Sequence, residues 1–131
     1  LSRQPLVWAG AENGHAWKTR PVRFGSTAHC VFRRPAIDAL ERAGLPWDLA
    51  VDSTSCSAVE VSVIADLAIF VQLEGSIPAR CEEIRHGGAL PPLPDYLINM
   101  YVGEGPRSAL ANRLAPLVRQ SYGCAQRVAA E

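Results

Sequence analysis

The 131-residue sequence lacks the patterns that most often indicate a metal site or a nucleic-acid interface. Its four cysteines form no Cys-x-x-Cys pair, and no Cys/His spacing matches a zinc finger. Lysine is nearly absent, with Lys18 alone beside twelve arginines, and basic residues form no stripe. The net charge is zero. We therefore expect no metal, no cofactor and no DNA contact from this part of the chain.

Long apolar segments are also missing. None approaches the roughly 20 residues that a membrane-spanning helix needs, and the first ten residues lack the charged region and apolar core of a signal peptide. The sequence begins without Met, so it reads as a fragment of a longer protein. The chain is long enough to bury a core without disulfides. We interpret its cysteines as reduced thiols and expect a cytoplasmic protein. They are Cys30, Cys56, Cys81 and Cys124.

The sequence does contain an alternation of short apolar runs and helical patterns. Strands are expected at 5–10, 21–26, 47–53, 67–75, 82–86 and 96–103. Helices are expected at 33–43, 55–65 and 106–121. Gly44 should stop the first helix, and Pro116 should kink or shorten the last one. Strands that are apolar on both faces and alternate with helices predict an α/β fold with a largely parallel sheet. The side chains of Trp8, Phe32 and Trp47 are expected in its core, and Trp17 in a polar loop.

The order of these segments resembles the effector-binding domain of LysR-type transcriptional regulators. The resemblance extends over residues 5–120 and is carried by the segments PLVWAG, RPVRF, CVFRRPAIDALERAGLPWDL, VDSTSCSAVEVSVIADLAIFVQLEGSIP and LPPLPDYLINMYV. The sequence departs from the family where Gly-Leu-Gly usually precedes the strand near residue 67, because Asp66, Leu67 and Ala68 stand there. A carboxylate at this position must find a partner or face solvent.

The resemblance implies a fold like that of type II periplasmic binding proteins, in which an effector cleft lies between two α/β lobes. This sequence would hold one complete lobe and the returning C-terminal part of the other. The implied divisions are a second lobe at 5–80, a return connection at 81–95, the last strand and helix of the first lobe at 96–121, and a tail at 122–131. The strand and helix at 96–121 would lack their neighbours, so we expect them to pair with another copy or with a separate chain.

The function implied by the resemblance is that of a regulatory domain that senses a small-molecule effector, and not that of an enzyme. DNA would be contacted only by a winged helix-turn-helix in an N-terminal part outside this sequence. A homo-oligomer, either a dimer or a tetramer, is expected. Three alternatives remain open: a thiol-sensing regulator, a solute-binding protein of the same fold, and an enzyme that uses His29 and Cys30.

Two junctions between a strand and the following helix, at 25–33 and 52–57, hold the residues that could bind an effector. In an open α/β sheet ligands lie at the carboxyl ends of the strands, where helix N-termini favour anionic groups. Hydroxyl groups add donors and acceptors, which favours an oxygen-rich or anionic molecule. The alternative is that these residues only cap helices and form turns. The candidate effector-binding residues are Ser26, Thr27, His29, Cys30, Phe32, Ser53, Thr54, Ser55 and Cys56.

Two features of these junctions suggest further roles. Cys30 and Cys56 each precede or open a helix, where a thiol is more reactive, so they are candidate redox residues. The alternative is that both are small buried apolar side chains. Arg33 and Arg34 open a helix against its dipole, which suggests an anionic ligand or an acidic partner.

Overall fold

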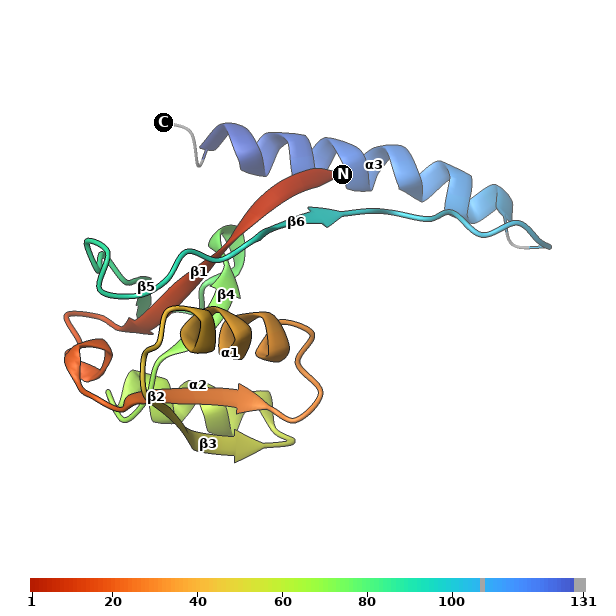
Figure 1. Cartoon of the computed structure of the whole chain (residues 1–131). Helices are drawn as coiled ribbons and strands as arrows, with labels where there is room; N and C mark the ends of the chain where they lie inside the picture. Colours follow the sequence, from red (N-terminus) through yellow and green to blue (C-terminus); the bar gives the residue numbers. More distant parts are fainter. Residues whose placement is uncertain (107, 129–131) are drawn as a thin grey trace. The chain divides into compact units, whose positions relative to one another are not determined.

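The structure is a computed structural model that describes residues 1–106 and 108–128 (Figure 1). The strands are β1 (Ser2–Ala11), β2 (Val22–Thr27), β3 (Trp47–Ser53), β4 (Phe70–Leu73), β5 (Cys81–Glu83) and β6 (Asp95–Ile98). The helices are α1 (Arg33–Arg42), α2 (Cys56–Ile64) and α3 (Ser108–Val128), with single 3-10 turns at Ala16–Lys18 and Glu74–Ser76. The chain divides into two compact units. The larger is Pro5–Asp95, and the smaller joins Leu1–Gln4 to the residues from Tyr96 onward.

Within the larger unit, β2 and β3 form a parallel pair in register from Val22↔Trp47 to Thr27↔Ser53, with an irregularity after Phe24. The other edge of β2 meets Ile69, which bridges to Phe24 in the parallel direction. β3 therefore lies on one side of β2, and the segment at Ile69 lies on the other side, parallel to it. The connection through α1 leads from β2 to β3, and the connection through α2 leads from β3 past β2 to Ile69. Since such crossovers are right-handed, α1 and α2 lie on opposite faces of these strands.

The remaining strands of this unit are antiparallel. β1 pairs with β4, from Leu6↔Leu73 to Ala9↔Phe70, and its other edge pairs with β5. The fold is thus mixed α/β. The prediction of a largely parallel sheet was wrong for β1, β4 and β5, which pair antiparallel. The apolar run of β1 indicated burial correctly, but burial on both faces does not reveal the direction of the neighbouring strands.

The core of the larger unit joins its two sheets through aromatic and aliphatic side chains. The rings of Trp8 and Phe24 meet edge to face, with centroids 6.1 Å apart, and the Trp8 indole nitrogen donates to the carbonyl oxygen of Pro91 at 2.8 Å. Val59 and Val63 of α2 are buried in a cluster with apolar residues of β1 and β4. Trp8 is in the core as expected, whereas Phe32 and Trp47 are only half-buried.

Local sequence explains where the two helices of this unit begin and end. Gly44 follows α1 with a φ of 67°, a left-handed conformation that glycine adopts without strain, as the sequence predicted. The side chain of Ser55 caps α2 by accepting the N–H of Ala58, so the helix begins at Cys56, within the range 55–65 expected from the sequence. Gly25 lies buried under α2, where an added Cβ would come within 3.4 Å of Val59.

The smaller unit differs from the prediction at both of its elements. β6 ends at Ile98, short of the strand expected at 96–103, and it pairs with β1. Within this unit the Leu1 ammonium donates to the carbonyl oxygen of Ile98. α3 continues through Pro116 to Val128, so Pro116 does not end the helix and the predicted tail from residue 122 is helical as far as 128. The side chain of Cys124 and residues 129–131 lie outside the described part.

The apolar stripe of α3 is mostly exposed. Its exposed members are Leu110, Leu114, Leu117, Val118 and Tyr122. Ala115, by contrast, is 6% exposed. No helix over the described residues combines the length and the apolar character needed to cross a membrane.

Candidate functional site

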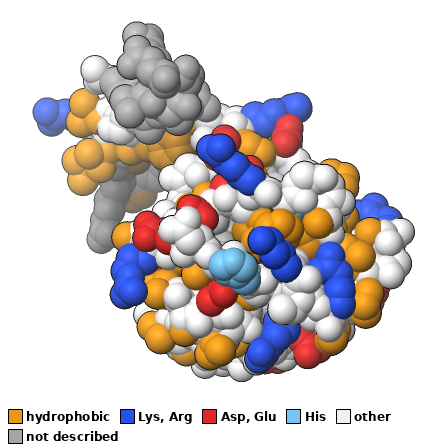
Figure 2. Space-filling view, turned by 90° about the vertical axis from the view of Figure 1, so that its left-hand side faces the viewer, with side chains coloured by type: hydrophobic (Ala, Val, Ile, Leu, Met, Phe, Trp, Pro, Cys, Tyr) orange, Lys and Arg blue, Asp and Glu red, His pale blue; other side chains and the backbone are white. Residues whose placement is uncertain are grey.

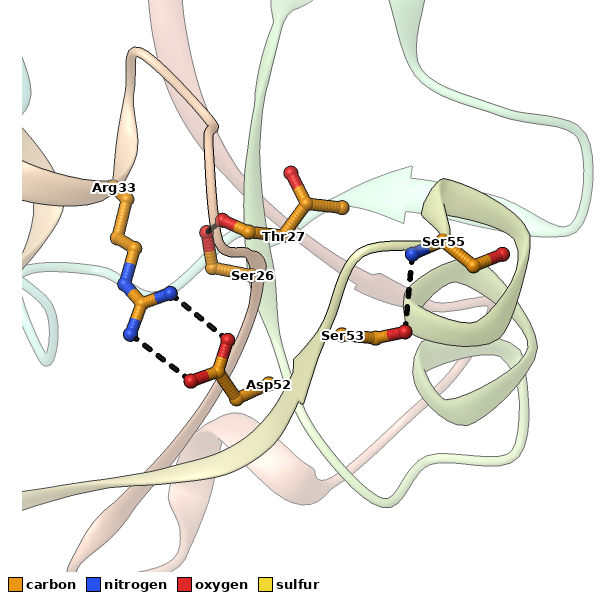
Figure 3. Close-up of polar contacts among 6 residues, drawn as sticks. All are labelled: Ser26, Thr27, Arg33, Asp52, Ser53 and Ser55. Carbon is orange, nitrogen blue, oxygen red and sulfur yellow. Dashed lines mark hydrogen bonds and ion pairs between the residues drawn. The ribbon is translucent and has the colours of Figure 1, made fainter.

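The parallel pairing of β2 and β3 brings both predicted junctions to one edge of the sheet. Thr27 lies opposite Ser53 in the register, and the backbone N–H of Ala28 donates to the Ser53 carbonyl oxygen at 3.0 Å. The side chains around these strand ends come from β2, β3 and the starts of α1 and α2 (Figure 3). We refer to residues 26–33 and 52–57 as the carboxyl edge.

The start of α2 offers hydrogen-bond donors at the carboxyl edge. The Ser55 backbone N–H donates to the Ser53 hydroxyl at 3.1 Å, and the Ser55 hydroxyl accepts from Ala58 at 3.4 Å (Figure 3 shows the first contact). The next two N–H groups, of Cys56 and Ser57, have no acceptor within an α-helix. Neither group donates a hydrogen bond to a residue in the described part of the chain. These groups, with the positive end of the helix dipole, suit an oxygen-bearing anion.

A bidentate ion pair at the carboxyl edge joins the start of α1 to the end of β3. The Arg33 guanidinium donates to both carboxylate oxygens of Asp52, at 2.9 and 3.3 Å (Figure 3). Arg34 is committed to its own helix, where it pairs with Asp38 at 2.8 Å. The suspected role of these arginines in binding an anion therefore has a simpler explanation, because each already has a carboxylate partner.

The other predicted site residues differ in how accessible they are. Ser26 is 5% exposed and its hydroxyl donates to the Thr27 carbonyl at 3.1 Å, so its proton is used within the fold. Cys30 and Phe32 are half-buried near the start of α1. Thr27 is also half-buried, and its hydroxyl makes no hydrogen bond with a described residue. The remaining predicted residues are exposed or half-exposed at the strand ends: His29, Ser53, Thr54, Ser55 and Cys56.

Three thiols are described, and all three are free: Cys30, Cys56 and Cys81. Burial raises the pKa of the Cys81 thiol, the carboxylates of Glu60 and Glu12 raise it further, and Arg80 partly opposes them. Cys81 is half-buried and packs against the core cluster under α2. Cys56 is exposed at the start of α2, so it is not the small buried apolar side chain that was the alternative for it. The redox role of Cys30 and Cys56 stays a prediction.

Two carboxylates that organise this unit were not among the predicted site residues. Asp52 was placed in the junction at 52–57 without a role, although an acidic residue at a strand end beside an arginine-led helix is a signal for an ion pair. Asp66, noted as a departure from the LysR pattern, accepts the backbone N–H groups of His15 at 2.8 Å and Ala16 at 3.0 Å. Its φ of 58° is the left-handed conformation that glycine would adopt there. No group of three His, Cys, Asp or Glu side chains with metal-binding spacing occurs among the described residues.

Comparison with known proteins gave a single kind of similarity. No protein-family model matches the sequence, and no curated protein matches it. Among solved structures, the chain is similar to the crystal structure of CbnR, a LysR family transcriptional regulator, with a TM-score of 0.45 and 13% sequence identity. The match covers 72% of this chain and 38% of that one, so the chain spans well under half the length of the protein it resembles.

Proposed function

We propose that this chain is an effector-sensing part of a LysR-type transcriptional regulator and binds a small molecule at the carboxyl edge. The observation that carries the proposal is the convergence of two strand ends and the α2 N-terminus. Thr27, Ser53 and Thr54 lie at the carboxyl ends of the paired strands β2 and β3, and α2 begins directly after them, at Cys56. In folds of this type ligands bind at the carboxyl ends of the strands.

The chemistry of the edge favours a neutral oxygen-rich molecule or a small carboxylate. The α2 N–H groups donate, and the hydroxyls both donate and accept. Because Arg33 is neutralised by Asp52, the edge offers no free guanidinium to form a strong bidentate contact with the ligand. The ligand would therefore be held by several modest hydrogen bonds.

In this proposal the DNA-binding module belongs to the rest of a longer cytoplasmic protein, and the chain itself catalyses no reaction. Residues 5–80 correspond to one lobe, 81–95 to the return connection and 96–121 to part of the other lobe. Effector binding transmits a signal only if the ligand favours one arrangement of the regulator over another. The thiol-sensing alternative is supported by the exposure of Cys56 at a helix start.

The experiment compares Thr→Val and Thr→Ser variants at positions 27 and 54. Valine keeps the shape but removes the hydroxyl, whereas serine keeps the hydroxyl and removes a methyl group. The probes are acetate, succinate, citrate and phosphate, titrated by calorimetry against the 131-residue chain. Each lost hydrogen bond should weaken binding by about 1 kcal/mol, which is roughly fivefold.

We expect at least one of these probes to bind, Thr27→Val and Thr54→Val to weaken it, and the serine variants to bind like the original chain. Circular dichroism checks that all four variants fold. Equal affinity of the valine and serine variants would refute a role for the hydroxyls. Failure of every probe would refute the assignment of the edge to small oxyanions.

A further inference from the structure

A pocket lies beside the loop that leads into β2, the strand whose other end is at the carboxyl edge. Its volume is about 360 Å³, within the range of small-ligand sites. One wall is the loop between β1 and β2, which contributes Asn13, His15, Trp17 and Lys18. The other wall is β5 with the residues that follow it. No residue of the carboxyl edge lines this pocket, and β2, which is six residues or about 20 Å long, runs from the end of the loop to that edge.

The loop wall is held in place by hydrogen bonds from its own backbone. Asp66 accepts the N–H groups of His15 and Ala16, and the Asn13 N–H donates to a Glu82 carboxylate oxygen at 2.9 Å. The Gly14 N–H donates to the Ala11 carbonyl oxygen at 2.9 Å. These contacts use backbone donors and leave the side chains of the loop available to a ligand.

The pocket contains charges of both signs that do not pair with each other. Glu83 and Arg85 are both exposed, and both line the pocket. Lys18 lies on the facing wall with its ammonium 5.2 Å from the centre of the Trp17 ring. Among the residues that the structure describes, no ion pair joins Lys18 or Arg85 to a carboxylate. Figure 2 shows a face of the molecule on which acidic, basic and imidazole groups lie among apolar side chains.

We propose that this pocket binds a small zwitterion of the α-amino-acid class. The ligand ammonium would face Glu83, its carboxylate would face Lys18 and Arg85, and an apolar side chain would pack beside the Trp17 indole. A simple anion would be repelled by Glu82 and Glu83, and a simple cation by Lys18 and Arg85. A molecule that carries both charges can pair its ammonium with Glu83 and its carboxylate with Lys18 and Arg85. This inference does not depend on the function proposed for the carboxyl edge.

The test uses L-leucine with two analogues that each keep its side chain and only one of its charges. These are 4-methylpentanoate, which lacks the ammonium, and 3-methylbutylamine, which lacks the carboxylate. Each is titrated into the 131-residue chain while backbone amide shifts are followed by NMR. We expect saturable shifts at residues 13–18 and 82–85 with leucine, and affinity at least threefold weaker for either analogue.

Two pocket variants assign the charges. Glu83→Gln should weaken leucine about two- to fivefold without weakening 4-methylpentanoate, and Arg85→Gln should weaken leucine and 4-methylpentanoate without weakening 3-methylbutylamine. Glu74→Gln and Arg23→Gln, which remove exposed charges outside the pocket, are the matched controls and should bind leucine normally.

Three outcomes would overturn the proposal. One is that leucine, added up to about a 20-fold molar excess over the protein, causes no saturable shifts at residues 13–18 and 82–85. Another is equal affinity for leucine and 4-methylpentanoate, which would mean an adventitious anion site. The third is leucine-induced shifts confined to residues 26–33 and 52–57, which would assign the ligand to the carboxyl edge and leave this pocket without one.

Discussion

The carboxylate of Asp66 provides a quantitative test of how the loop before β2 is held. Asp66 ends α2 in a left-handed conformation and accepts two backbone N–H groups from a segment 50 residues earlier. Two contributions oppose each other at this residue. The hydrogen bonds stabilise the fold, and the positive φ of a residue with a Cβ destabilises it.

Substitutions at position 66 separate these two contributions. Hydrogen bonds to a charged acceptor contribute about 1.5–3 kcal/mol when shielded. Because Asp66 is half-exposed and water can replace it, we expect Asp66→Ala to cost about 2 kcal/mol for the two bonds together. Asp66→Gly loses the same bonds but relieves about 1 kcal/mol of backbone strain, so it should cost about 1 kcal/mol. Asp66→Asn keeps one neutral acceptor and should lie between alanine and the original residue.

Urea unfolding followed by tryptophan fluorescence measures these free energies in the unit that contains the loop, because Trp8, Trp17 and Trp47 all lie in that unit. Asp48→Ala, at an exposed position in β3, is the matched control for loss of a carboxylate and should change stability by less than about 0.5 kcal/mol. If alanine and glycine at position 66 have equal stability, the strain argument is wrong. If alanine is as stable as aspartate, the hydrogen bonds do not hold the loop.

Two further predictions concern the thiols and the exposed helix. Iodoacetamide at pH 8 should alkylate Cys56 faster than Cys81, and Glu60→Gln should speed the reaction of Cys81 by lowering its pKa, with peptide mapping as the measurement. The folded state raises the pKa of Cys81, so folding is favoured while this thiol is protonated. This contribution to the free energy of unfolding is fully present below the ordinary thiol pKa and is lost as the pH rises from there through the raised pKa. If the exposed helix pairs with a second copy, one of the two partners expected for it, light scattering of the chain should give a mass above the monomer, and Leu114→Gln with Leu117→Gln should lower it. A monomer at all concentrations would contradict pairing with a second copy.

Local signals predicted the elements around the carboxyl edge well. α1 was expected at 33–43 and runs from Arg33 to Arg42, because Pro35 and Gly44 mark its two ends by their backbone preferences. β3 was expected at 47–53 and has these bounds. The placement of Ser53, Ser55 and Cys56 at a strand-to-helix junction follows from these short-range features alone.

The last strand and helix were predicted less well, for a physical reason. The apolar run at 96–103 indicated a long buried strand, but only Asp95–Ile98 pairs with a neighbour. A strand forms only where another strand supplies hydrogen-bond partners, and a sequence does not specify how long that partner is. Pro116 was expected to interrupt the helix, yet α3 extends on both sides of it. The local cost of proline is therefore insufficient to end this helix.

The sequence by itself determined that the apolar runs of β1 and β4 are buried, where α1 begins and ends, and which side chains stand at the strand-to-helix junctions. These properties depend on residues a few positions apart, through backbone preference and apolar periodicity. The tertiary structure decided the pairing of Arg33 with Asp52, the capture of the His15 loop by Asp66, and the meeting of that loop with β5 to form a pocket. Each of these joins residues that are 19 to about 70 positions apart, and their approach depends on strand order and direction, which burial patterns do not encode.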